Sequence, residues 1–166
     1  MLAPWLEMKR GNQCPLCAPR PRSNEFVYFV SELAVSSLYL ARNQTHLGTC
    51  TLVYDPAHVS RPSELDVESW SRFCADAWTA EAAVSRAFQP DHINLECLGN
   101  SVPHLHIHII PRYRNDANWG HPVDFRELRR TFVTPDAECE KLAGRLRESL
   151  NAGNPGAPGN VSERDR

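Results

Sequence analysis

The chain has no run of about 20 apolar residues, the length that a membrane-spanning helix requires. It also lacks an excess of charge of one sign, because 18 Lys and Arg face 20 Asp and Glu and leave a net charge of −2. Without a basic field, nothing favours binding to nucleic acid or to an anionic membrane. Residues 1–15 lack the apolar stretch of a signal peptide. These absences predict a cytoplasmic protein that binds neither membranes nor nucleic acid.

Glycine and proline are concentrated in one place, the segment 151–160, which reads NAGNPGAPGN. This composition offers almost nothing to bury and is typical of disorder. The rest of the 166 residues is long enough for one domain. We therefore expect an N-terminal extension over residues 1–13, one domain over 14–150 and a disordered tail over 151–166.

Five short segments are rich in β-branched and aromatic residues, as strands are, and two others have helical periodicity. The strands are expected over residues 25–30, 35–41, 49–54, 92–97 and 104–110, with Pro111 closing the last one. A long helix is expected between Ser63, as its N-cap, and Pro90. A second helix is expected from Thr134 to Leu150. Strands, helix, strands and helix in this order predict an α+β fold with antiparallel connections.

The most informative segment is Gly99–Arg112, which reads GNSVPHLHIHIIPR. Strand alternation sends His104, His106 and His108 to one face, about 7 Å apart, and apolar side chains to the other face. One interpretation is the solvated polar face of an amphipathic strand. A second is a catalytic metal held by several of these histidines. A third is a nucleophilic imidazole that attacks phosphorus, with Asn100, Ser101 and backbone N–H groups holding the phosphate oxygens.

Two of the six cysteines form a CxxC pair, Cys14-Pro-Leu-Cys17. The pair could be half of a zinc site, a redox pair or two ordinary thiols. No second CxxC exists, so a zinc site would need two histidines to complete its tetrahedron. The other cysteines are expected to be small core residues and the histidines without a motif to be exposed: Cys50, Cys74, Cys97, Cys139, His46, His92 and His121.

The segment PHLHIHIIPRY resembles the histidine-triad signature of the HIT family of nucleotide hydrolases and transferases. The preceding GNSV resembles the family's Gly-Gln-(Ser/Thr)-Val, and TCTLVYDPAH resembles its second landmark, a strand that ends in a loop with a histidine. With Asp116, Trp119 and Gly120 downstream, the pattern is closest to bacterial members described as diadenosine polyphosphate hydrolases. The resemblance covers residues 14 to 122. It implies a HIT-like antiparallel sheet of about five strands, packed with one long helix and a C-terminal helix, in a homodimer.

The resemblance also implies roles for individual residues. His106 would be the nucleophile, His108 would orient the α-phosphate, and Asn100 and Ser101 would contact the phosphate or the leaving group. Family members with an N-terminal CxxC bind structural zinc, and the corresponding ligands here are Cys14, Cys17, His58 and His104. The remaining substrate contacts implied are Asn94 near the same pocket and Arg42 or Asn43 near the ribose. Two departures from the family pattern are Cys50 in place of a histidine and Asn100 in place of a glutamine.

The expected activity is hydrolysis of a dinucleoside polyphosphate at its α-phosphate through a covalent nucleotidyl-histidine. A nucleoside phosphoramidate or an acyl-adenylate stays open as substrate, and phosphate could replace water as the acceptor. Magnesium could accompany the substrate. Two readings of other classes also stay open: a nucleotide-binding regulatory module with little turnover, and a metal-centred hydrolase that uses His104, His106 and His108 together.

Overall fold

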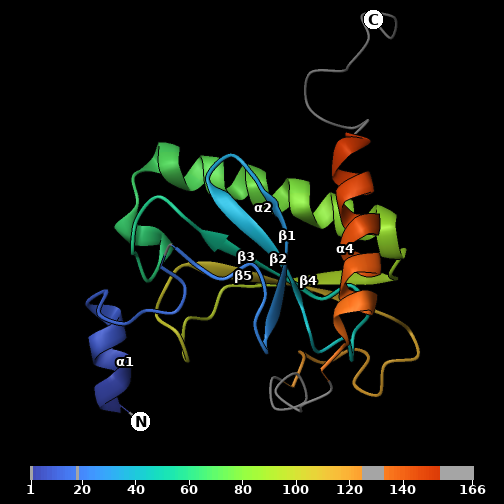
Figure 1. Ribbon diagram of the computed structural model, residues 1–166, viewed down its shortest axis with the longest axis horizontal. Coiled ribbons are helices and arrows are strands. Elements are labelled where there is room, and N and C mark those ends of the chain that lie inside the picture. Colours follow the sequence, from blue (N-terminus) through green and yellow to red (C-terminus); the bar gives the residue numbers. More distant parts are fainter. Residues whose placement is uncertain (1, 18, 125–132, 154–166) are drawn as a thin grey trace, which may run out of the picture.

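A computed structural model describes residues 2–17, 19–124 and 133–153 (Figure 1). The helices are α1 (Leu2–Lys9), the 3-10 turn η1 (Pro62–Glu64), α2 (Val67–Phe88) and α4 (Asp136–Asn151). The strands are β1 (Val27–Glu32), β2 (Ser36–Ala41), β3 (Cys50–Tyr54), β4 (His92–Glu96) and β5 (His106–Arg112). The expected strands and the two expected helices are present, and the fold class is α+β. Helix α1 was not predicted.

The five strands form one sheet in the order β1-β2-β3-β5-β4, and every neighbouring pair is antiparallel. Strand β5 therefore lies inside the sheet, between β3 and β4, whereas β4 is an edge strand. The expectation that Pro111 closes β5 is wrong, because the strand continues through Pro111, which pairs with Ile93. The proline is tolerated because pairing with β3 stops at Ile109, so no ladder bond on that side needs its missing N–H.

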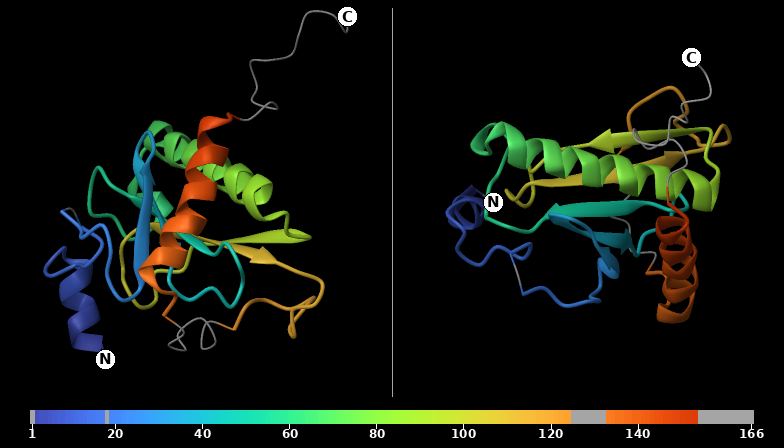
Figure 2. Two further views of the ribbon diagram at one scale, coloured as in Figure 1. Left: turned by 45° about the vertical axis from the view of Figure 1, so that its right-hand side comes forward. Right: turned by 90° about the horizontal axis from the view of Figure 1, so that it is seen from above.

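Helices α2 and α4 cover one face of the sheet (Figures 1 and 2). Their apolar stripes and the strand residues that face them form one buried core, with members such as Leu38, Leu52, Phe73, Ile109 and Leu146. Phe73 of α2 lies at its centre and packs edge-on against Tyr54, with ring centroids 5.5 Å apart. The apolar face of β5 is thus packed in the core, and the side chains on its other face are available for binding or catalysis.

The start of α2 differs from the expected one. Its N-cap is Asp66, whose side chain accepts a hydrogen bond from the backbone N–H of Ser69 at 2.7 Å. Ser63, the predicted cap, lies within η1 one turn earlier. Asp is an equally good capping residue, and the intervening 3-10 turn could not be distinguished from helix by sequence pattern. The helix ends at Phe88, and Gln89 caps it in the left-handed region with φ 51°, directly before Pro90.

On the opposite face of the sheet lies the N-terminal segment, which is not helical where it contacts the strands. Arg20 in the N-terminal segment donates to the Tyr39 hydroxyl at 3.1 Å and pairs with Asp55, which holds that segment against β2 and the end of β3. Ahead of it, α1 stands apart from the other helices in every view (Figures 1 and 2). Within the described residues, no helix combines the length and the apolar character needed to cross a membrane.

Candidate functional site

Strand β5 and the residues before it divide their side chains as the alternating pattern predicts. Leu105, Ile107 and Ile109 enter the core beneath α2 and α4. His106 and His108 lie on the opposite face, with ring centroids 4.9 Å apart and planes at 88°. His106 is only 7% exposed, so the imidazole row is not a solvated polar face. The interpretation of the three histidines as the solvated polar face of an amphipathic strand is therefore wrong.

The tautomer of His106 follows from one hydrogen bond. Its Nδ1 lies 2.6 Å from the backbone carbonyl oxygen of His104, and a carbonyl can only accept. Nδ1 therefore carries the proton and Nε2 keeps its lone pair. Burial lowers the pKa of His106, which favours this neutral form. The strand thus presents an imidazole whose free nitrogen can act as a nucleophile or accept a proton.

His108 lies next to this group and contacts β3. Its Nδ1 is 3.3 Å from the Thr51 hydroxyl, within hydrogen-bond distance. Burial, and then the charge that His106 would carry, lower the pKa of His108 to about 4. His108 is therefore neutral in the ground state. Its place beside His106 suits the orientation of an anionic group bound between the two rings.

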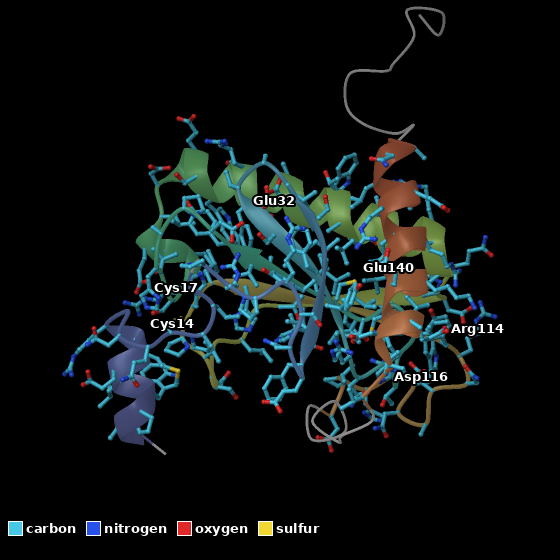
Figure 3. All side chains as sticks on the ribbon, in the orientation of Figure 1. Cys14, Cys17, Glu32, Arg114, Asp116 and Glu140 are labelled. Atoms are coloured by element: carbon cyan, nitrogen blue, oxygen red, sulfur yellow. The ribbon has the colours of Figure 1, made fainter. Side chains whose placement is uncertain are left out.

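A second cluster lies at the start of β5, where the N-terminal segment meets the sheet. The ligand atoms of Cys14, Cys17, His58 and His104 all lie within 4.8 Å of one another. His104 Nδ1 is 3.6 Å from Cys14 Sγ and 3.7 Å from Cys17 Sγ, and His58 Nδ1 is 3.4 Å from Cys17 Sγ. Figure 3 shows the two cysteines together beside the top of α1. In the described part of the chain, this is the group of side chains able to hold a metal ion.

The cluster fits tetrahedral zinc. Zn–S bonds of about 2.3 Å and Zn–N bonds of about 2.0 Å place neighbouring sulfur and nitrogen ligands about 3.5 Å apart, as they are here. Each histidine also donates its outer N–H to a backbone carbonyl: His104 Nε2 to Tyr54 at 2.7 Å and His58 Nε2 to Lys9 at 3.2 Å. Both inner nitrogens are thereby left as lone-pair donors, which is the usual arrangement around protein-bound metals.

The loop between β4 and β5 carries the predicted phosphate contacts, Asn100 and Ser101, both of them exposed. The loop turns at Gly99, whose φ of +72° favours glycine. The indole Nε1–H of Trp5 in α1 donates to the Gly99 carbonyl at 3.2 Å. Sequence analysis missed Trp5, since nothing in residues 1–13 signals a partner 94 positions away. Helix α1 therefore contacts both the metal cluster, through Lys9, and this loop.

The other predicted substrate residues lie at different places. Asn94 of β4 faces the same side of the sheet as the triad, and its Oδ1 accepts from Arg112 Nη1 at 2.9 Å. Arg42, just after β2, is buried, and its guanidinium donates to the Thr134 carbonyl at 2.9 Å and pairs with Asp136. Asn43 accepts from the Thr45 backbone N–H at 2.9 Å in a local turn. Their contacts with a substrate stay predictions.

Several residues without a motif are not where they were expected. His46 is buried, with Nδ1 3.2 Å from Asp116 Oδ2, and is not a surface residue. Cys74 and Cys97 are exposed and are not core residues, whereas Cys50 and Cys139 are buried as expected. Burial of a single histidine or cysteine depends on which segments fold over it, and local pattern carries no signal for that.

Comparison with known proteins agrees with this geometry. The model of the HIT domain family matches residues 31–115, about half of the chain, which contain β2 to β5 and all three triad histidines. A search of the curated proteins found no match.

Three solved structures illustrate the structural likeness. A histidine triad protein from Sinorhizobium meliloti is 24% identical with a TM-score of 0.66, covering 74% of this chain and 89% of that one. A Zn-bound histidine triad family protein from Mycobacterium smegmatis is 16% identical with a TM-score of 0.55, covering 75% and 84%. The diadenosine triphosphate hydrolase of Plasmodium falciparum is 16% identical with a TM-score of 0.58, covering 89% and 98%. At these identities the likeness establishes the fold.

Proposed function

Because the chain belongs to the HIT domain family, we propose that it is a nucleotide hydrolase that acts at an α-phosphate through a covalent nucleotidyl-histidine. The observation that carries the proposal is the hydrogen bond from His106 Nδ1 to the His104 carbonyl, which leaves Nε2 with a free lone pair. The nucleophile is held by the strand itself, so little reorganisation is needed to reach the transition state.

The reaction has two displacements at phosphorus. In the first, His106 Nε2 attacks the α-phosphorus, the bond to the leaving phosphate oxygen breaks, and that oxygen keeps the electron pair. Nδ1 keeps its proton and donates it in a hydrogen bond to the His104 carbonyl, which stabilises the positive charge that the ring acquires. In the second, water adds to phosphorus, the P–N bond breaks, and a proton is released to solvent. A nucleoside monophosphate leaves, and His106 returns to its neutral tautomer.

Within this mechanism, His108 orients the α-phosphate, while Asn100 and Ser101 contact the phosphate or the leaving group. Asn94 lines the same face of the sheet, and Arg42 or Asn43 contacts the ribose. Backbone N–H groups of the Gly99 turn add donors for the anionic oxygens. These assignments extend the family resemblance to the residues present here.

A dinucleoside polyphosphate is the proposed substrate. The likeness to the Plasmodium falciparum diadenosine triphosphate hydrolase supports this choice. A nucleoside phosphoramidate, an acyl-adenylate, or phosphorolysis in place of hydrolysis would use the same nucleophile. A screen of diadenosine polyphosphates against adenosine phosphoramidate, with phosphate present or absent, separates these possibilities, and omitting magnesium shows whether it accompanies the substrate.

We propose that zinc has a structural role in this site, held by Cys14, Cys17, His58 and His104. The Zn-bound relative from Mycobacterium smegmatis supports the choice of metal. A metal-centred hydrolase that uses His104, His106 and His108 together is disfavoured because both ring nitrogens of His104 are engaged elsewhere. Its Nδ1 faces the two cysteines, and its Nε2 donates to the Tyr54 carbonyl. Zinc would tie the N-terminal segment to the residue whose carbonyl sets the His106 tautomer.

In the part of the chain that the structure describes, the sheet also ends at β4, next to the triad strand. Leu95 on this edge strand and Leu98 just after it are about half exposed, at 50% and 46%. An open, partly apolar edge is a surface on which a second copy can pair. We therefore propose a homodimer, and light scattering at micromolar concentration tests it by returning the mass of one chain or of two.

The decisive experiment traps the intermediate. The protein is mixed with diadenosine tetraphosphate labelled at its α-phosphates and quenched in alkaline detergent, because phosphorus–nitrogen bonds of this kind break in acid. The expected result is a label on His106, released by acid and absent from His106→Ala. A thermal melt shows whether His106→Ala is folded. Turnover without a label would refute the covalent mechanism, and absence of both would favour a regulatory nucleotide-binding module.

A further inference from the structure

A cavity of about 690 Å³ opens beside β4, and Asn94 is the residue of its lining that has so far been assigned to the substrate. Its walls come from two segments, β4 with the residue before it and the loop that follows β5. The residues that matter for its chemistry are His92, Asn94, Glu96, Arg112 and Trp119. Ligand sites for small molecules have volumes of about 300–1,000 Å³, so the cavity is large enough for a nucleoside.

The cavity adjoins the triad through the register of the sheet. Glu96 pairs directly with His108, and Asn94 pairs with Ile110, two residues further along β5. Directly paired residues in an antiparallel ladder point to the same face with Cα atoms about 4.5–5.5 Å apart. Glu96 therefore stands beside His108 on the triad face. A molecule held between the two histidines can reach the cavity without crossing a strand.

The outer wall is held in place by Arg112, which is buried at the end of β5. Its guanidinium donates to the backbone carbonyls of Asn118 at 3.0 Å and His121 at 2.9 Å, on either side of Trp119. The same group donates to the Asn94 side chain at 2.9 Å and so joins the two walls. Asp116, labelled at the lower right of Figure 3, marks the base of this loop. Because the loop carbonyls are fixed, Trp119 is presented by a preformed wall.

The lining offers two kinds of contact that suit a nucleoside. Trp119 is 43% exposed, so a large part of its indole is free to stack on a base. Glu96 supplies a carboxylate, the group that commonly accepts hydrogen bonds from ribose hydroxyls. Burial raises the pKa of Glu96, and the positive charge of the nearby Arg112 opposes this shift. The phosphate groups would bind at the triad, and the nucleoside would bind in the cavity beside β4.

We propose that this cavity binds the nucleoside of the leaving half of the substrate, with the base on Trp119 and the ribose hydroxyls on Glu96. The inference rests on the proposed function, since it names what leaves from the phosphorus that His106 attacks. The substrate is then a dinucleotide, because a leaving group without a nucleoside would leave the cavity empty. Specificity for dinucleoside polyphosphates would then come from β4 and this loop rather than from the triad.

The first test compares two substrates that differ only in the leaving group, diadenosine tetraphosphate and the p-nitrophenyl ester of AMP. Trp119→Ala should lower kcat/KM for the dinucleotide about 5- to 150-fold, the value of one stacked base, and change the ester less than about twofold. Glu96→Gln should act in the same direction. Trp78→Ala is the matched control, because Trp78 is 42% exposed on α2 and does not line the cavity. Equal losses for both substrates, or no loss, would overturn the proposal.

A second measurement keeps this test separate from the proposed function. In a His106→Ala background, calorimetry gives the affinities for diadenosine tetraphosphate and for AMP. The dinucleotide should bind more tightly, and Trp119→Ala should remove that advantage while Trp78→Ala keeps it. A parent protein without this advantage, or an advantage that survives Trp119→Ala, refutes the cavity assignment whether or not the wild-type protein turns over substrate. If the dinucleotide keeps its affinity advantage but the wild-type protein does not turn it over, only the proposed enzymatic activity is refuted.

Discussion

Replacement of Cys17 by serine tests the zinc assignment, because Cys17 contacts both histidines of the cluster. Its sulfur lies 3.4 Å from His58 Nδ1 and 3.7 Å from His104 Nδ1. A serine hydroxyl is not a zinc ligand at neutral pH, so three donors would remain. Burial and the neighbouring Cys14 thiol raise the pKa of Cys17 in the absence of metal, and a bound divalent cation would instead stabilise the thiolate.

The magnitude follows from linkage. A ligand that binds only the folded state at 100 times its Kd adds about 2.7 kcal/mol to the free energy of unfolding. For a domain of this size, each kcal/mol moves Tm by about 2–4 °C, so chelation should lower Tm by about 5–10 °C. The structure supports a folding role because the cluster joins residues that are 90 positions apart, Cys14 and His104. Without metal, the segment over residues 10–17 would lose the coordination bonds that link Cys14 and Cys17 to His58 and His104.

The assay combines metal analysis with thermal melts. Wild-type protein should contain one zinc per chain, Cys17→Ser should contain far less, and its Tm should match that of the chelated wild type. Cys74→Ser is the matched control, since Cys74 is exposed on α2 and outside the cluster. It should keep both the zinc and the Tm. Chelated protein held below its melting temperature should still be labelled at His106.

Two results would refute the reasoning. If Cys17→Ser retains one zinc per chain, the metal is held elsewhere. If chelation leaves Tm unchanged but abolishes labelling of the folded protein, the metal belongs to catalysis, and a metal-centred hydrolase replaces the structural site.

Two further predictions concern the loops that contain Gly99 and Gly48. Trp5→Phe keeps an aromatic side chain but removes the indole N–H that donates to the Gly99 carbonyl, so amides of residues 98–102 should exchange hydrogen about tenfold faster while global stability changes little. Unchanged exchange would show that α1 does not hold this loop. Gly48→Ala should lower the free energy of unfolding by about 2 kcal/mol or more in urea titrations, because Gly48 has φ +90° and a Cβ there would lie 2.4 Å from the Phe88 ring. Gly144→Ala, in α4 with nothing within 4 Å, should stabilise the protein slightly, and a similar loss in both variants would contradict the steric argument.

Much of the candidate site could be inferred from local pattern. The alternation over residues 104–110 places histidines and aliphatic residues on opposite faces of a strand, and this geometry needs no knowledge of neighbours. Helical periodicity likewise predicted α2 and α4, although the N-cap of α2 is Asp66 and not the predicted Ser63. Boundaries are less certain because several residues near a terminus can supply a capping oxygen.

The features that local pattern could not reveal depend on contacts between segments that are distant in the sequence and meet only in the folded chain. His46 is buried because the loop after β5 brings Asp116 to it, and Trp5 contacts Gly99 because α1 stands beside the loop before β5. The cavity beside β4 exists because Arg112 binds the carbonyls around Trp119. None of these contacts follows a period of 2 or 3.6 residues.

The amino-acid sequence by itself determined the class of fold, the faces of the strands and helices, and the family, because hydrophobic periodicity and the histidine signature are local properties of the chain. The tertiary structure decided which nitrogen of His106 is free, because a single backbone carbonyl chooses the tautomer. It also brought four candidate zinc ligands from three separate segments within 4.8 Å, and it opened a cavity beside β4. Antiparallel pairing of distant strands sets these distances, and a one-residue shift in register would undo them.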